Sequence, residues 1–218
     1  SSGISIAGRS FVGGIAGYNM SGAYLEKNSS KANITAAGNY VGGIAGANSG
    51  TILQEAVSPD DPADGIGMTA TNIAGNRGEG IGGLVGWNQA GGSIMAESDG
   101  TEAEAEVVVV NAGVTVTGNE KVGGIVGIHG GSLGSGGTYL VCEAELVQAV
   151  EDCAGGIIGA AETEAGTQGN ADRMISYAIN RSEEVTADRG RAGGIVAVNN
   201  DGFTVSACIN QGNVNSDQ

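Results

Sequence analysis

The sequence predicts an all-β fold: a right-handed parallel β-helix of about six coils that forms a single domain over residues 1–218. Three observations predict it. A glycine-rich motif recurs along the chain, its apolar positions align between copies, and short strand-like segments separated by turn residues lie between the copies. A repeat of this kind indicates one supersecondary unit that stacks on its neighbours. The expected hand follows from the preference of parallel strands for right-handed connections.

The recurring motif is a glycine pair, two apolar residues, a third glycine and, two positions later in most copies, a polar residue. The first glycine of the pair falls at positions 13, 42, 82, 123, 155 and 193, so the intervals range from 29 to 41 residues. A constant motif at variable spacing is expected of a fixed coil cross-section that carries loops of different size. The copies are Val12–Asn19, Val41–Asn48, Ile81–Asn88, Val122–His129, Ala154–Ala161 and Ala192–Asn199.

Two neighbouring positions of the motif are apolar in all copies. Successive residues of an extended strand point to opposite faces, so we expect both faces of this strand to be covered, as is usual in parallel sheets. We expect the first position to form a buried column in which each side chain stacks on the next. This column consists of Ile15, Ile44, Leu84, Ile125, Ile157 and Ile195, and the second position holds Ala16, Ala45, Val85, Val126, Ile158 and Val196.

The last position of the motif is mostly asparagine. An asparagine amide both donates and accepts, so stacked asparagines can form hydrogen bonds along a solenoid axis. We therefore predict a structural asparagine ladder here, rather than a row of ligand-binding amides. The ladder is expected to break near the last two copies, where Ala161 replaces the asparagine and Ala197 replaces the third glycine. The column consists of Asn19, Asn48, Asn88, His129, Ala161 and Asn199.

Each repeat contains further short strands, bounded by Gly, Asn, Asp and Ser. At the start of the chain, Ile6-Ala7-Gly8 matches Ile34-Thr35-Ala36 and predicts a strand of the preceding coil. The strands expected before the glycine pair begin at Ile34, Val116 and Val185, and those expected after the polar position begin at Thr51, Ser93, Thr138, Arg173 and Phe203.

The motif and the strand that follows it resemble the GLUG-type repeat of bacterial surface proteins, and so does the C-terminal stretch Ala207–Val214. The resemblance extends over nearly the whole chain, from Ile4 to Val214. Such repeats occur in adhesins of the filamentous-haemagglutinin kind and in non-catalytic regions of IgA-protease-like metallopeptidases. The resemblance implies a β-helical, extracellular repeat region at the bacterial cell surface, and it carries over no catalytic residues.

Composition and charge narrow the possible partners. Glycine accounts for 42 of 218 residues, and with a period this indicates many tight turns rather than disorder. The net charge of −15 disfavours nucleic acid and anionic membranes as partners. No apolar run approaches the roughly 20 residues of a membrane-spanning helix. We expect an acidic, extracellular, monomeric protein, and a segment cut from a longer exported chain.

The cysteines are too few for a disulfide framework. Cys142, Cys153 and Cys208 make an odd number, so we interpret them as buried free thiols. A bridge between Cys142 and Cys153, which would close a short loop, is the alternative.

The sequence offers few groups for chemistry. His129 is the only histidine, which excludes a multi-histidine zinc site. The glycine motifs lack the lysine of a phosphate-binding loop. Asp60, Asp61 and Asp64 could hold Ca²⁺ together with backbone carbonyls, but they do not match an EF-hand, and a solvated loop is the preferred interpretation. We predict no catalytic residue, no cofactor-binding residue and no metal ligand, with calcium as a minor alternative.

The expected function is therefore that of a non-catalytic repeat scaffold, with adhesin-like binding or presentation and with a host or cell-surface protein or glycan as partner. The variable inserts are the candidate contact regions. They are Ser58–Gly65, Glu162–Gly169 and Gly131–Gly137. The alternatives are a passive stalk of a larger secreted protease and, less favoured, a polysaccharide lyase or hydrolase.

Aromatic side chains could discriminate between these functions, because a sugar-binding face would show aligned rings. Tyr18 and Trp87 share the column that precedes the asparagines. The other members of that column carry no ring, which favours the stalk or protein-binding interpretation. They are Ala47, Ile128, Ala160 and Val198.

Overall fold

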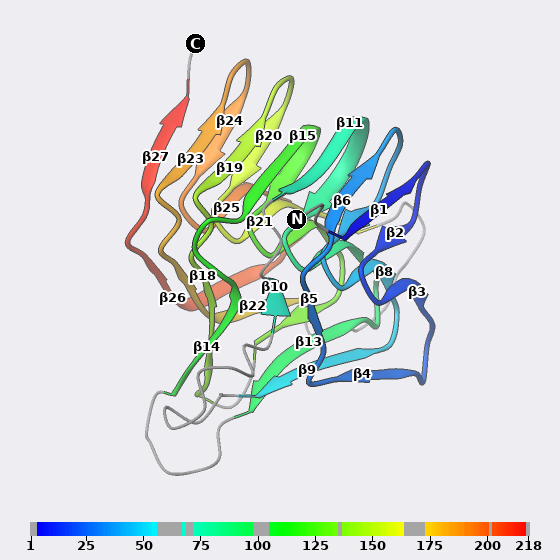
Figure 1. Ribbon diagram of the computed structural model, residues 1–218. Helices are drawn as coiled ribbons and strands as arrows, with labels where there is room; N and C mark the ends of the chain where they lie inside the picture. Colours follow the sequence, from blue (N-terminus) through cyan, green and yellow to red (C-terminus); the bar gives the residue numbers. More distant parts are fainter. Residues whose placement is uncertain are drawn as a thin grey trace.

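The computed structural model describes residues 4–55, 67–68, 72–97, 105–134, 137–163, 173–200 and 202–216. Over these residues the chain forms strands and turns and no helix, and the strands pair in parallel (Figure 1). The prediction of an all-β fold is confirmed. This part of the chain contains no apolar helix of membrane-spanning length.

An 11-stranded sheet, called sheet A, contains the strands on either side of the turn that precedes each glycine pair. Across the upper part of Figure 1, its strands lie side by side with the strands one repeat away. They are β1 (Ser5–Gly8), β2 (Val12–Gly13), β6 (Asn33–Ala36), β7 (Val41–Gly42), β11 (Asn72–Gly82), β15 (Thr115–Gly123), β19 (Leu146–Ala149), β20 (Cys153–Gly155), β23 (Glu184–Ala187), β24 (Arg191–Gly193) and β27 (Asn213–Ser216).

A six-stranded sheet, called sheet B, contains the second half of every motif copy. Its strands are β3 (Ala16–Asn19), β8 (Ala45–Asn48), β12 (Val85–Asn88), β16 (Val126–His129), β21 (Ile158–Ala161) and β25 (Val196–Asn199). A 10-stranded sheet, called sheet C, contains the strands between copies. They are β4 (Tyr24–Glu26), β5 (Ser29–Ser30), β9 (Thr51–Glu55), β10 (Gly67–Met68), β13 (Ser93–Glu97), β14 (Glu106–Val110), β17 (Ser132–Leu133), β18 (Tyr139–Cys142), β22 (Met174–Asn180) and β26 (Thr204–Asn210).

The pairing register follows the motif. In sheet B, Val85 pairs with Ala45 on one side and with Val126 on the other, so every strand lies against the same segment of the next repeat. The predicted match at the start of the chain is confirmed, because Ile6 pairs with Ile34 and Gly8 with Ala36. Parallel strands with partners one repeat away are the arrangement expected of a β-helix or solenoid.

The glycine pair lies at a corner where there is no room for a side chain. A Cβ on Gly82 would lie 2.0 Å from the carbonyl oxygen of Val85, and a Cβ on Gly83 would lie 2.0 Å from the carbonyl oxygen of Gly124 in the next repeat. The third glycine is confined as well, since a Cβ on Gly86 would lie 2.4 Å from the backbone nitrogen of Val41. The motif therefore recurs because the chain turns sharply while its neighbours lie in direct backbone contact.

The predicted aliphatic column forms the centre of the core, but it is not buried along its whole length. Ile44, Leu84, Ile125 and Ile157 are fully buried. Ile15 is instead 45% exposed, and Ile195 is only partly buried against the core. The prediction that all six are buried is wrong at these two positions, because among the described strands of sheet B, β3 pairs only with β8 and β25 only with β21.

The three cysteines are free thiols, and the bridge considered between Cys142 and Cys153 is not formed. Both of these side chains are buried, whereas Cys208 is partly exposed. Burial raises the pKa of Cys142 to about 11 and that of Cys153 to about 12.

Candidate binding surface

The asparagine column forms the predicted ladder over the first four repeats. Nδ2 of Asn19 donates to Oδ1 of Asn48 at 2.8 Å, and Nδ2 of Asn48 donates to Oδ1 of Asn88 at 2.7 Å. Asn88 then donates to Nδ1 of His129 at 3.2 Å, and the ladder ends there because Ala161 comes next. Asn48, Asn88 and His129 are fully buried, so the amides stabilise the stack and are not accessible to a ligand.

His129 closes the ladder with one nitrogen unsatisfied. Because Oδ1 of Asn88 already accepts from Asn48, Asn88 donates to Nδ1 of His129, which leaves the proton on Nε2. Nε2 is buried and makes no hydrogen bond of normal geometry to the described residues. Burial lowers the pKa of His129 to about 3, and the nearby backbone of Met174 and Gly131 offsets only part of that effect. The ring packs against Phe203, with 5.6 Å between the centroids, so it is a structural group.

Four aromatic rings form a row on the surface, which we call the aromatic row. It consists of Phe11, Tyr18, Tyr40 and Trp87, and two of its members, Tyr18 and Trp87, directly precede ladder asparagines in the sequence. The ring centroid of Phe11 lies 6.2 Å from that of Tyr18 and 5.0 Å from that of Tyr40. Tyr40 and Trp87 are stacked, with 4.7 Å between centroids and 29° between planes. Phe11 and Tyr18 are each 43% exposed, and Tyr40 and Trp87 are partly buried. The row extends over the first three repeats.

Two different positions of the repeat build this row. Tyr18 and Trp87 lie in β3 and β12, in the column that precedes the asparagines. Phe11 and Tyr40 lie on the other side of the glycine pair, directly before β2 and β7, in a left-handed conformation with φ of 55° and 63°. Within the column of Tyr18 and Trp87 the rings are not neighbours, because Ala47 pairs between them. The row arises because Phe11 and Tyr40, which lie outside that column, bridge the gap. The signal that could have found the row is the aromatic residue before the motif in each of the first two copies.

A pocket of about 160 Å³ continues the row toward the C-terminus. Trp87, Tyr40 and Ile128 provide apolar walls, and its other lining residues are Glu79, Glu162 and Thr163. Gly80 lies between the two sides: a Cβ there would be 3.0 Å from Cδ1 of Tyr40 and 3.2 Å from Cδ1 of Ile128. Glycine at this position therefore lets Tyr40 and Ile128, which line the pocket, pack closely against the backbone.

An ion-pair triad lies at the polar side of the pocket. Nζ of Lys121 lies 2.9 Å from Oε2 of Glu79 and 2.5 Å from Oε1 of Glu162. Burial lowers the pKa of Lys121, but the hydrogen bonds and charges of Glu162 and Glu79 outweigh this, so the pKa is raised above its usual value. The ion pairs hold the two lining carboxylates, Glu79 and Glu162, on the same side of the pocket.

The predicted contact regions lie only partly within the described residues. The loop Ser58–Gly65, with Asp60, Asp61 and Asp64, falls outside them. Of Glu162–Gly169 only Glu162 and Thr163 are described, and both line the pocket. Residues 135–136 of Gly131–Gly137 are not described, and none of the described residues of this range lines the pocket. Within the described parts of the chain, no group of three or more His, Cys, Asp or Glu side chains is placed to hold a metal ion.

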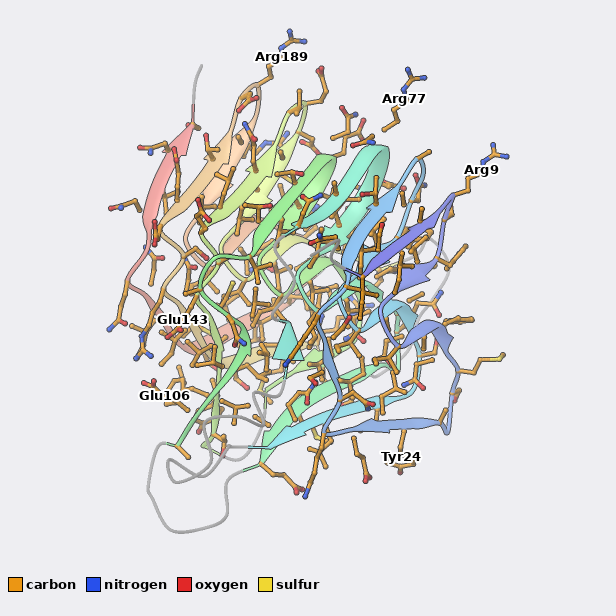
Figure 2. The ribbon with its side chains drawn as sticks, viewed as in Figure 1. Arg9, Tyr24, Arg77, Glu106, Glu143 and Arg189 are labelled. Carbon is orange, nitrogen blue, oxygen red and sulfur yellow. The ribbon has the colours of Figure 1, made fainter. Side chains whose placement is uncertain are left out.

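Other charged side chains connect repeats at the surface. Arg181 binds both carboxylate oxygens of Glu106 and approaches Glu143, on the side of the molecule where Figure 2 labels these two glutamates. Figure 2 also shows Arg9, Arg77 and Arg189 projecting from one edge of the stack. Arg189 pairs with Glu151 at 3.1 Å. These pairs are exposed, and such contacts contribute little to stability.

Comparison of the chain with protein-family models, with curated proteins and with solved structures finds no match.

Proposed function

We propose that this chain is a non-catalytic binding scaffold of an exported bacterial cell-surface protein, built as a right-handed β-helix of about six coils. The observation that carries the proposal is the aromatic row beside an open pocket. Partly exposed rings next to a pocket with polar groups are the usual make-up of a binding site. The rest of the repeat is used for stacking, since its glycines, aliphatic column and asparagines contact one another.

The extracellular location is supported by composition and by the resemblance to GLUG-type repeats. An acidic, glycine-rich chain with a net charge of −15 suits a soluble surface segment and disfavours nucleic acid. The segment acts through shape and surface, as an adhesin-like binding or presenting region, and its partner is a protein or glycan of a cell surface.

Binding assays with the purified chain test this function. The chain is immobilised and exposed to arrays of glycans and of extracellular proteins, while soluble polysaccharides incubated with it are analysed for shortened or unsaturated products. We expect saturable binding of at least one partner and no change in any polysaccharide. Absence of binding on both arrays would favour a passive stalk, and product release abolished by a single carboxylate substitution would identify a lyase or hydrolase.

An experimental structure tests the architecture. We expect one coil for each motif copy and right-handed connections between the sheets. Left-handed connections, or a motif copy that does not form a coil, would contradict the proposed β-helix.

A further inference from the structure

We propose that the pocket beside Trp87 binds one pyranose ring of a neutral oligosaccharide, and that adjoining sugar units lie along the aromatic row. This inference rests on the proposed binding function and names the class of its partner. The pocket is lined by Tyr40, Trp87 and Ile128 on its apolar side and by Glu79, Glu162 and Thr163 on its polar side.

The first argument is that the pocket is a local departure from the repeat. The residue before the motif is Phe11, Tyr40, Gly80 or Lys121 in the first four copies, and its φ is 55°, 63°, 73° and 52°. Three of the four copies adopt this left-handed conformation with a side chain, so the backbone alone does not require glycine at position 80. What glycine allows there is close packing, because an added Cβ would press on Tyr40 and Ile128, two residues that line the pocket.

The second argument concerns size. A volume of about 160 Å³ is smaller than the roughly 300–1,000 Å³ of pockets for drug-sized ligands. It is far larger than the roughly 10–15 Å³ that one water molecule requires. The pocket therefore suits a single ring rather than a large, enclosed ligand, with the rest of the ligand outside it.

The third argument concerns the chemistry of the walls and rim. A pyranose ring presents an apolar C–H face and a periphery of hydroxyl groups, each of which both donates and accepts. Trp87, Tyr40 and Ile128 line the pocket with apolar surface for that face, and Trp87 and Tyr40 support each other by stacking. The carboxylates of Glu79 and Glu162 accept hydrogen bonds, and a threonine hydroxyl such as that of Thr163 can both donate and accept, so the polar side suits a ligand with both kinds of group.

Charge argues against an anionic ligand, which would meet two carboxylates on a chain with a net charge of −15. A cation could interact with the rings, but it would have to compete with Lys121, whose ammonium group already pairs with both Glu79 and Glu162. A neutral ligand meets neither the repulsion nor this competition.

The fourth argument is the continuation of the surface beyond the pocket. From Trp87 the rings continue through Tyr40 and Phe11 to Tyr18. The hydroxyl of Tyr18 lies in hydrogen-bond contact with the side chains of Ser49 and Gln89, so polar groups border the far end of the row as well. A ligand with repeated apolar faces and polar edges, such as an oligosaccharide, matches this alternation over several repeats.

The test uses Trp87 itself, since it is the only tryptophan of the chain and its fluorescence reports on the pocket directly. The purified chain is titrated with neutral gluco-, galacto- and manno-oligosaccharides, from monosaccharide to hexasaccharide. We expect a saturable fluorescence change for at least one series, with an affinity that increases with chain length until the row is covered. Choline and sulfated oligosaccharides are the cationic and anionic probes.

Gly80→Asn presses a side chain against two wall residues of the pocket, Tyr40 and Ile128, at a position where asparagine tolerates the left-handed backbone. Gly113→Asn is the matched control, because Gly113 has a φ of 82° and no atom within 4 Å of an added Cβ. Tyr40→Ala removes a wall, and Tyr24→Ala is its control, since Tyr24 is an exposed ring outside the row. We expect Gly80→Asn and Tyr40→Ala to weaken sugar binding at least about tenfold, and both controls to bind as the parent does. Circular dichroism identifies any variant that fails to fold.

Three results would overturn the inference. Unchanged sugar affinity in folded Gly80→Asn and Tyr40→Ala would place the site elsewhere, and tighter binding of choline or of a sulfated probe would give the pocket another ligand. If no neutral sugar changes the fluorescence but the chain still binds a protein on the array, the oligosaccharide is the wrong ligand and the proposed binding function stands. If the chain binds nothing on either array, both proposals fail.

Discussion

Ile125 and Ile15 occupy the same motif position, one in the middle of the stack and the other in its first repeat. Ile125 is fully buried, whereas Ile15 is 45% exposed. The residue type, the local backbone and the flanking glycines are the same, so the difference comes from the repeats on either side. Burial in this fold is supplied by neighbouring coils, as expected of a structure in which each repeat contacts only the next.

The asparagine column shows the same contrast in hydrogen bonding. Asn48 accepts from Asn19 and donates to Asn88, and it is fully buried. Asn199, in the last repeat, is exposed and donates to the carbonyl oxygen of Phe203 at 3.3 Å. One amide in the interior links two neighbours, while the same amide in the last repeat caps a local turn.

The largest expected effect comes from a charge in the aliphatic column. Ile125→Asp places an unpaired carboxylate in the core, and we expect it to cost more than about 4 kcal/mol or to prevent folding. Ile15→Asp is the matched change at the exposed position and should cost within about 1 kcal/mol. Thermal unfolding followed by circular dichroism measures both. Equal losses in the two variants would mean that the column is not organised by its neighbours.

A smaller loss is expected from the ladder. Asn48→Ala leaves the buried Oδ1 of Asn88 without its donor, which should cost about 2–3 kcal/mol and lower the Tm by roughly 5–10 °C. Asn199→Ala removes an exposed amide and should lower the Tm by no more than about 2 °C. Similar Tm values for the two variants would show that the ladder contributes little to stability.

The histidine of the ladder should make the interior sensitive to acid. The pKa of His129 is lowered from 6.5 to about 3, so the unfolded chain binds the proton more readily between these values. Stability from this group is complete above pH 6.5 and is lost as the pH falls toward 3, by an amount on the order of 4 kcal/mol. His129→Asn replaces the ring by an amide that does not titrate and can continue the ladder.

Urea unfolding of the parent and of His129→Asn, measured in steps from neutral to acid pH, isolates this contribution from that of the carboxylates. We expect the free energy of unfolding of the parent to fall more steeply in this window. Parallel pH profiles would show that His129 is protonated without cost in the folded protein.

The smallest expected difference is in the chemical reactivity of the three thiols, and it involves no change in the stability of the protein. Cys142 and Cys153 lie in interior repeats and are buried, with pKa values raised to about 11 and 12, whereas Cys208 lies in β26 of the last repeat and is partly exposed. Iodoacetamide should modify Cys208 first in the native protein, and the other two only in denaturant. Mass spectrometry identifies the labelled residue. Early labelling of Cys142 would indicate that the middle of the stack opens.

The asparagine ladder and the aromatic row show which parts of a site can be predicted. The ladder members occupy one position of one motif, so alignment of the copies is enough to place Asn19, Asn48 and Asn88 in register. The row combines two positions on either side of the glycine corner, and alignment of either one alone leaves gaps. Glu79, Lys121 and Glu162 come from three different repeats at different distances from the motif, so no local pattern predicts their contact.

The sequence by itself determined the parallel all-β architecture, the register of the repeats and the buried middle of the aliphatic column. It could do so because these features depend on short-range requirements, such as glycines where a Cβ would collide with backbone, that recur in each copy. The tertiary structure alone decided which repeats are covered, which rings lie side by side and where Tyr40, Trp87 and Ile128 line a pocket. These depend on distances between residues of different coils, which are set by stacking and not by the chain on either side of them.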